Sequence, residues 1–148
     1  MQLKICLLGL IVLLSYSCKT PQNFTPDSFQ GSMITFGSEG GFAGTTAENY
    51  IFENGQFYSY ESKNGALQEL GTIEKTVVKQ LFDNFTTLGF DKLELNDPGN
   101  LSYYIKMKTG EEEKVIRWGG MNEETPPLLK QYFLNLGQIA RKYKIVTQ

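Results

Sequence analysis

The sequence predicts an α+β fold, with a mainly antiparallel sheet and two amphipathic helices packed on one of its faces. Segments with the two-residue alternation of β-strands come in adjacent pairs joined by turn signals, which favours hairpins. Two longer segments carry apolar residues at spacings of three and four, which is the period of a helix. The predicted order is ββββ-α-ββ-α, without the internal repeats of a solenoid.

Residues 1–17 predict a signal peptide. The basic residue Lys4 precedes ten apolar residues, Ile5–Leu14, and a bilayer-spanning helix would need about 20. Ser17 before Cys18 resembles the lipobox of bacterial lipoproteins, a family in which the cysteine becomes the first residue and carries acyl chains. We therefore expect Cys18 to be the lipidation site. The alternative is an ordinary thiol behind a plain signal peptide.

The cysteine count favours lipidation. Cys6 lies in the leader, so Cys18 would be an unpaired cysteine in an exported chain, and acylation explains it. Each buried methylene contributes about 0.8 kcal/mol, so two or three acyl chains would anchor the protein to a membrane durably. Residues 18–30 contain two prolines and no sustained periodicity, which predicts a flexible tether before a single globular domain over residues 31–148.

Four strands are predicted in the first half of the domain, at Ser32–Phe36, Asn49–Glu53, Gln56–Glu61 and Ala66–Leu70. Asn54-Gly55 joins the second strand to the third and predicts a type I′ turn, in which both central residues have positive φ. Lys63-Asn64-Gly65 predicts the next turn. The Gly-rich segment 37–46 predicts a loop between the first two strands, since its glycines tolerate positive φ.

Residues Ile73–Leu88 predict the first helix. Thr72 is its expected N-cap, and Gly89 is expected to end it in a left-handed conformation with Phe90 packed on the last turn. The predicted buried face consists of Ile73, Val77, Leu81, Phe85 and Leu88. A loop over Asp91–Asn100 is expected to follow.

Two strands, Tyr103–Lys108 and Lys114–Trp118, precede the last predicted helix at Pro126–Lys144. Thr125 is the expected cap of that helix. It directly precedes Pro126, and proline favours the first helical turn. Its predicted buried face consists of Leu128, Tyr132, Leu136, Ile139 and Tyr143, broadened by Leu129, Phe133 and Ala140. We expect Trp118 to be a core residue near the edge of the sheet.

The composition excludes several classes of function. The 148 residues include no histidine, so there is no histidine base, no Ser-His-Asp or Cys-His pair and no His-ligated zinc. The formal charge is −2, and the sequence has no stripe of basic residues of the kind that a nucleic-acid-binding protein carries. Neither a phosphate-binding loop nor a dinucleotide fingerprint is present. We predict a protein that is not an enzyme, has no cofactor or metal and binds no nucleic acid.

Acidic and aromatic clusters have simpler explanations than a site. Glu111–Glu113 lacks the spacing of a calcium loop, and Glu123-Glu124 suits a helix N-terminus, so we expect solvated surface for both. The aromatic strands of residues 50–60 have no interleaved basic residues, which favours packing over a stacking platform. A ligand-binding protein or carboxylate enzyme remains an alternative, and it predicts a concave pocket with at least two acidic side chains.

The Gly-rich segment 37–46 is the candidate recognition loop. Phe42 is an apolar side chain between Gly41 and Gly44, on a backbone that can approach a partner closely. The alternative is a flexible connection with no contact role. We name Glu39, Gly40, Gly41, Phe42 and Gly44 as the candidate partner-binding residues.

Several segments resemble a widespread family of bacterial lipoproteins that has no assigned activity. The similarity covers Ser32–Tyr143 and rests on Phe36–Gly44, Asn54-Gly55, Asp97–Asn100 before Tyr103-Tyr104, Ile116–Gly119 and Pro126-Pro127. It implies a lipid-anchored protein of the bacterial cell envelope. Some lipoproteins carry acidic surface-export residues directly after the lipidated cysteine, and these are missing here, which favours the outer membrane with the domain facing the periplasm.

More loosely, Gly40–Gly44 after a first strand is similar to emfourin, a family of compact protein inhibitors of protealysin-like, thermolysin-type metalloproteases. That resemblance implies that Phe42 enters an apolar specificity pocket while the glycines let the backbone lie close. Glu39 would offer an oxygen to the protease zinc. The predicted function is therefore a lipid-anchored, non-enzymatic envelope protein that acts by protein or ligand contact, with metalloprotease inhibition through loop 37–46 as the alternative.

Overall fold

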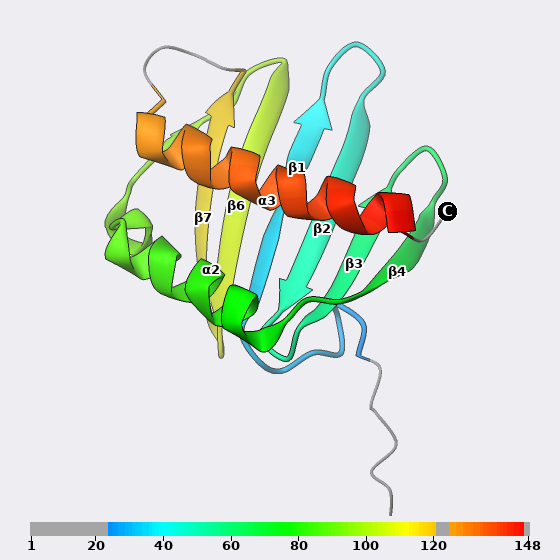
Figure 1. Ribbon diagram of the computed structural model, residues 1–148. Coiled ribbons are helices and arrows are strands. Elements are labelled where there is room, and N and C mark those ends of the chain that lie inside the picture. The colour runs from blue at the N-terminus through cyan, green and yellow to red at the C-terminus, as the bar shows by residue number, and fades with distance from the viewer. Residues whose placement is uncertain (1–23, 121–124, 147–148) are drawn as a thin grey trace, which may run out of the picture.

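The computed structural model describes residues 24–120 and 125–146. Cys18, the predicted signal peptide and Glu123-Glu124 lie outside these residues. The described residues form a mixed α+β structure in which one seven-stranded sheet has the order β4-β3-β2-β1-β6-β7-β5 (Figure 1). The predicted fold class, with a mainly antiparallel sheet, is confirmed.

All neighbouring strands are antiparallel except the pair β5 and β7. The strands are β1 (Met33–Gly40), β2 (Thr45–Phe52), β3 (Gln56–Glu61), β4 (Ala66–Thr72), β5 (Asn96–Asp97), β6 (Leu101–Thr109) and β7 (Glu112–Gly119). The first strand lies in the middle of the sheet, because β1 pairs with β2 on one side and with β6 on the other. Two consecutive hairpins therefore extend the sheet from β2 to β4, and the β6–β7 hairpin extends it on the opposite side.

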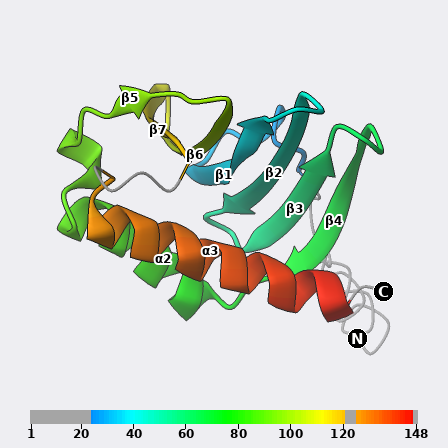
Figure 2. The same ribbon diagram turned by 90° about the horizontal axis from the view of Figure 1, so that it is seen from above.

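Two helices, α2 (Lys75–Thr87) and α3 (Pro127–Val146), lie on the same side of the sheet in both views (Figures 1 and 2). Alternate strand residues such as Ile34, Phe36 and Ile105 pack with Leu81 of α2 and Leu136 of α3 in the main core. The opposite face has a smaller apolar cluster at one end, formed by Phe29, Met33, Phe52 and Tyr58. Among the described residues, no helix covers the rest of that second face.

The Gly-rich segment is mostly strand, so the predicted loop over residues 37–46 is wrong in extent. β1 continues to Gly40 and β2 begins at Thr45, which leaves residues 41–44 as the connection. Gly40 is paired with both Thr45 and Leu101. Pairing on both sides of β1 outweighs the low strand preference of glycine, which is context-dependent.

The second turn also differs from its prediction. The β2–β3 hairpin forms, but its loop has three residues, 53–55, and Gly55 N–H donates to Phe52 O over 2.9 Å. Among the described residues only glycines have positive φ, so Asn54 does not, and the type I′ prediction is wrong. Gly55, at φ 96°, supplies the left-handed residue of a three-residue hairpin loop. The Asn54 carboxamide is used instead to accept the Gln56 N–H at 2.9 Å.

The first helix begins two residues later than expected. Thr72 ends β4, so it is not the N-cap; Glu74 occupies that position without a side-chain cap bond. Val78 takes a buried place, whereas Leu88 is 39% exposed and is not part of the core. The predicted end is confirmed, since Gly89 has φ 77° and the Phe90 ring packs on Phe85 with centroids 5.8 Å apart.

The remaining corrections concern the second half. The predicted loop 91–100 contains the strand β5, and its first two residues belong to a 3₁₀ turn, Phe90–Lys92. In α3, Leu129 is buried and Leu128 is 58% exposed, because the buried stripe runs through Leu129, Tyr132, Leu136 and Ala140. The starting proline of α3 is Pro127. Trp118 is in the core as predicted, being 2% exposed.

Candidate functional site

A row of residues with mostly polar or aromatic side chains crosses the helix-free face of the sheet. The strand registers place one residue from each of six strands in this row, in the order Arg117, Tyr104, Gly37, Glu48, Tyr60 and Leu67. A second row, two residues along the strands, contains Lys106, Thr35, Tyr50, Tyr58 and Glu69. Side chains in one row lie next to those in the other, because residues two apart share a face of a strand.

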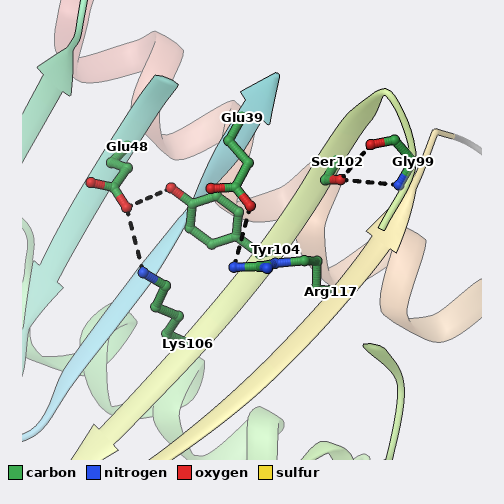
Figure 3. Close-up of polar contacts among 7 residues, drawn as sticks. All are labelled: Glu39, Glu48, Gly99, Ser102, Tyr104, Lys106 and Arg117. Carbon is green, nitrogen blue, oxygen red and sulfur yellow. Dashed lines mark hydrogen bonds and ion pairs between the residues drawn. The ribbon is translucent and has the colours of Figure 1, made fainter. Parts of the chain in front are cut away.

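Glu48 is the centre of a hydrogen-bonded cluster on this face. The hydroxyl of Tyr104 donates to Glu48 Oε1 over 2.5 Å, and the hydroxyl of Tyr50 donates to Oε2 over 2.6 Å. Lys106 Nζ lies 3.7 Å from Oε1 and 4.9 Å from the centre of the Tyr104 ring (Figure 3). One carboxylate thus holds two phenols and is also contacted by an ammonium group.

Gly37 makes this cluster possible. Tyr104 is on β6 and Glu48 is on β2, and Gly37 of β1 lies between them in the same row. Since glycine has no side chain, the Tyr104 ring can cross β1 and reach the carboxylate on the far side (Figure 3). An aromatic ring over a cross-strand glycine also covers the exposed backbone.

Glu39 and Arg117 form the other ion pair of this face, with Glu39 Oε1 and an Arg117 terminal nitrogen 3.2 Å apart (Figure 3). Beyond it, Ser102 Oγ accepts the Gly99 N–H and donates to Gly99 O, both over 3.1 Å, which fixes the turn before β6. The buried Nε of Arg117 has no hydrogen-bond partner among the described residues. The carboxylate of Glu39 is thus paired with Arg117 on this face.

The two tyrosines of the cluster are held in their neutral form. Burial raises the pKa of Tyr104, and the hydrogen bond to the ionised Glu48 raises it further. The pKa of Tyr50 is raised by the same two causes in the same order, and the charges of Glu48 and Asp27 add to the shift. Both effects favour the protonated phenol, so neither tyrosine supplies a phenolate base or nucleophile near neutral pH.

These raised pKa values predict a loss of stability at alkaline pH. The folded protein keeps phenol protons that the unfolded chain releases near its usual pKa of about 10, so this stability is complete below about pH 10 and is lost as the pH rises further. Urea unfolding followed from about pH 8 to about pH 11 should show the decline. Tyr104→Phe should make the decline shallower. An equally steep decline in the variant would show that Tyr104 does not contribute.

The hairpin end between β1 and β2 contains the predicted partner-binding residues. Gly40, Gly41 and Gly44 have φ values of 96°, 71° and 57°, and Gly41 N–H donates to Asn100 O over 2.7 Å. Phe42 projects from this turn with a relative exposure of 108%. The structure thus gathers Gly40, Gly41, Phe42 and Gly44 at one tip, while the Glu39 side chain belongs to the helix-free face.

The cluster around Glu48 was not found from the sequence. The sequence shows the alternation that puts Glu48 and Tyr50 on one face of their strand, and the same is true of Tyr104 and Lys106. It does not show that β1 lies between these two strands. The interpretation of the aromatic strands as packing is correct for the buried Tyr58, whereas Tyr50 and Tyr60 are half-buried.

Two hollows meet the condition set for a ligand-binding protein, namely two acidic side chains in a concave pocket. One, of about 390 Å³, is lined by Asp27 and Glu48 together with tyrosines of the helix-free face. The other, of about 460 Å³, lies near the β6–β7 turn and is lined by Asp91, Glu112 and Glu113. Within residues 24–120 and 125–146, no group of three or more Asp, Glu, Cys or His side chains could hold a metal ion.

Comparison with known proteins adds no family assignment. No protein-family model matches the chain, and the search of curated proteins finds no significant match. In the part of the chain that the structure describes, neither helix has the length and apolar character needed to cross a bilayer.

Proposed function

We propose that this protein is a lipid-anchored, non-enzymatic protein of the bacterial cell envelope, which binds a protein partner through the β1–β2 hairpin tip. The observation that carries the proposal is the full exposure of Phe42. A phenylalanine that packs on nothing contributes no burial energy to the fold, whereas covering it with a partner would contribute about 1.5–3 kcal/mol. The flanking glycines Gly41 and Gly44 let the partner approach the backbone.

The position of the tip suits a membrane-anchored protein. The predicted tether leads into β1 at Met33, and the tip follows β1 at its far end (Figure 1). Eight residues of strand extend roughly 26 Å at about 3.3 Å each. Acyl chains on Cys18 would therefore place the domain with Phe42 pointing away from the bilayer. We further propose that two amphipathic helices covering a single sheet face keep both the tip and the opposite face accessible.

A photo-cross-linking amino acid at position 42 tests the proposed contact in the native envelope. We expect a discrete adduct with one partner protein from position 42 and none from position 64, in the neighbouring β3–β4 turn. Asn64 is a suitable control because it is also an exposed turn residue of the same sheet. Adducts of equal yield from both positions would contradict a specific contact at Phe42.

Phe42→Ser is expected to separate binding from folding. The free energy of unfolding should change by less than about 0.5 kcal/mol, because Phe42 packs on no other residue. The partner should no longer be captured by the variant. Thermal unfolding and co-purification with the partner identified by cross-linking measure the two effects. If the variant captured the partner as well as the wild-type protein does, a role for the tip would be refuted.

The anchor is tested separately by incorporation of labelled palmitate. We expect label in the wild-type protein and none in Cys18→Ser, which should also leave the membrane fraction. Two acyl chains hold a protein on a membrane where one chain gives only reversible binding, so loss of the modified cysteine should release the domain. A labelled Cys18→Ser protein would contradict the proposed site.

Inhibition of a thermolysin-like metalloprotease is the second candidate, and the exposed Phe42 between glycines favours it. The ion pair of Glu39 with Arg117 gives no support to a zinc-binding role for Glu39. Titration of the purified protein against such a protease tests the idea. We expect the protein to inhibit the protease and Phe42→Ala to weaken the inhibition. An absence of inhibition at micromolar concentrations of the protein would reject this candidate.

A further inference from the structure

The hollow beside Glu48 has a lining of unusual chemistry. It lies between the segment before β1, which supplies Asp27, and strands β2 and β3, which supply Glu48, Tyr50 and Tyr60. Its volume of about 390 Å³ is within the range of small-molecule pockets, about 300–1,000 Å³. Leu67 of β4 closes one side. None of the described residues that line the hollow is basic.

Two carboxylates line the hollow. Asp27 and Glu48 both raise the pKa of Tyr50, since each carboxylate disfavours a second negative charge nearby. Lys106 contacts Glu48 through Oε1, whereas Oε2 accepts from Tyr50, which also lines the hollow. Asp27 forms no ion pair within the described part of the chain. An anionic ligand would be repelled here, and a cation would be attracted.

The fold already shows how this face holds a cation. On the other side of Glu48, Lys106 places its ammonium group 3.7 Å from the carboxylate and 4.9 Å from the centre of the Tyr104 ring. A carboxylate and a tyrosine ring together therefore bind an ammonium group within the molecule. The hollow repeats the combination with Asp27, Glu48, Tyr50 and Tyr60, and none of the described residues in its lining is a cation.

We propose that this hollow binds an organic cation, an alkylammonium or guanidinium group, between the tyrosine rings of Tyr50 and Tyr60 and the carboxylates of Asp27 and Glu48. The ring faces attract the cation through their quadrupoles, and the carboxylates pair with its charge. The group could belong to a free amine or to a lysine or arginine side chain of a partner. This site is separate from the hairpin tip and does not depend on the function proposed for Phe42.

Ligand-detected NMR on the full-length protein in a non-ionic detergent tests the site with choline as the probe. Neohexanol, a neutral alcohol of nearly the same shape, is the control ligand. We expect saturable binding of choline and at least about fivefold weaker binding of neohexanol, because the alcohol lacks the charge. Equal binding of both, or no saturable binding of choline up to tens of millimolar, would overturn the proposal.

Two variants locate the binding. Asp27→Asn and Tyr60→Leu should each weaken choline binding by about threefold to tenfold. Glu111→Gln removes one exposed charge at the β6–β7 turn and is the control with the same change in net charge, so it should bind like the wild type. Wild-type affinity in Asp27→Asn would overturn the assignment. Thermal unfolding of each variant shows whether it is folded.

A lysine-containing pentapeptide and its norleucine counterpart distinguish the two sources of the cation. Tighter binding of the lysine peptide than of choline would assign the site to a partner's side chain, and the reverse order would assign it to a free amine. Either order supports the proposed site, whereas equal binding of the lysine and norleucine peptides, without choline binding, would refute it. Phe42→Ser should leave all of these affinities unchanged, so failure at the tip and failure at the hollow give different results.

Discussion

Trp118→Ala is expected to lower the free energy of unfolding by about 3–5 kcal/mol, the usual cost of removing a buried tryptophan. Trp118 is among the largest fully buried side chains and joins the sheet to α3. Its ring packs edge-on against Phe133 with centroids 5.3 Å apart, and the Tyr103 ring lies 6.2 Å away. Alanine would leave a cavity between the two layers that these rings could fill only by moving.

Urea unfolding at neutral pH measures this effect, and Leu128→Ala is the matched control. Leu128 is also a large apolar residue, but it is 58% exposed on α3. Its replacement should cost less than about 1 kcal/mol, because little apolar surface returns to water. Similar losses in the two variants would contradict the placement of Trp118 in the core.

Gly37→Ala is expected to destabilise the protein by about 1–3 kcal/mol, the range for overpacking a well-packed site. A Cβ atom at Gly37 would overlap the carbonyl oxygen of Ala47, a backbone atom that cannot rotate away. Gly37 also lies beneath the path of Tyr104 to Glu48, so relief of the overlap would disturb that hydrogen bond. The variant should therefore lose stability and also show a changed Tyr104 environment by NMR.

Gly137→Ala is the control for this substitution, and the opposite sign is expected. Gly137 is in the interior of α3, where a Cβ atom would meet no other atom within 4 Å. Alanine in a helix interior is favoured over glycine by about 0.5–1 kcal/mol, so this variant should gain stability. Equal losses from both glycine substitutions would show that the crowding at Gly37 is not the cause.

The local elements of this fold are well predicted by the sequence because short-range signals determine them. Asn54-Gly55 marks a hairpin, and Gly89 marks a helix end. The turn type is not determined by that dipeptide, and the difference matters for the site. A two-residue loop would place Glu61 opposite Glu48, whereas the three-residue loop places Tyr60 there. A shift of one residue moves every side chain of a strand to the other face.

The candidate site could not be predicted because its members come together through distant pairings. Tyr104 and Glu48 are 56 residues apart, and they meet only because β1 pairs with β6. Hydrophobic alternation shows which residues of a strand share a face but not which strand lies beside it. The exposure of Phe42 follows from a local pattern, an aromatic residue between glycines, whereas its contact role stays a prediction.

The central place of β1 has a mechanical consequence. The same strand connects Met33, where the predicted tether enters, to Gly40, where the tip begins. If a partner holds the tip while acyl chains hold the other end in a membrane, tension between them runs along β1. Because both points of attachment lie on this one extended strand, its covalent backbone would carry the force, and the hydrogen bonds to β2 and β6 would bear little of it. Under that proposal, the domain would stay folded while it is pulled.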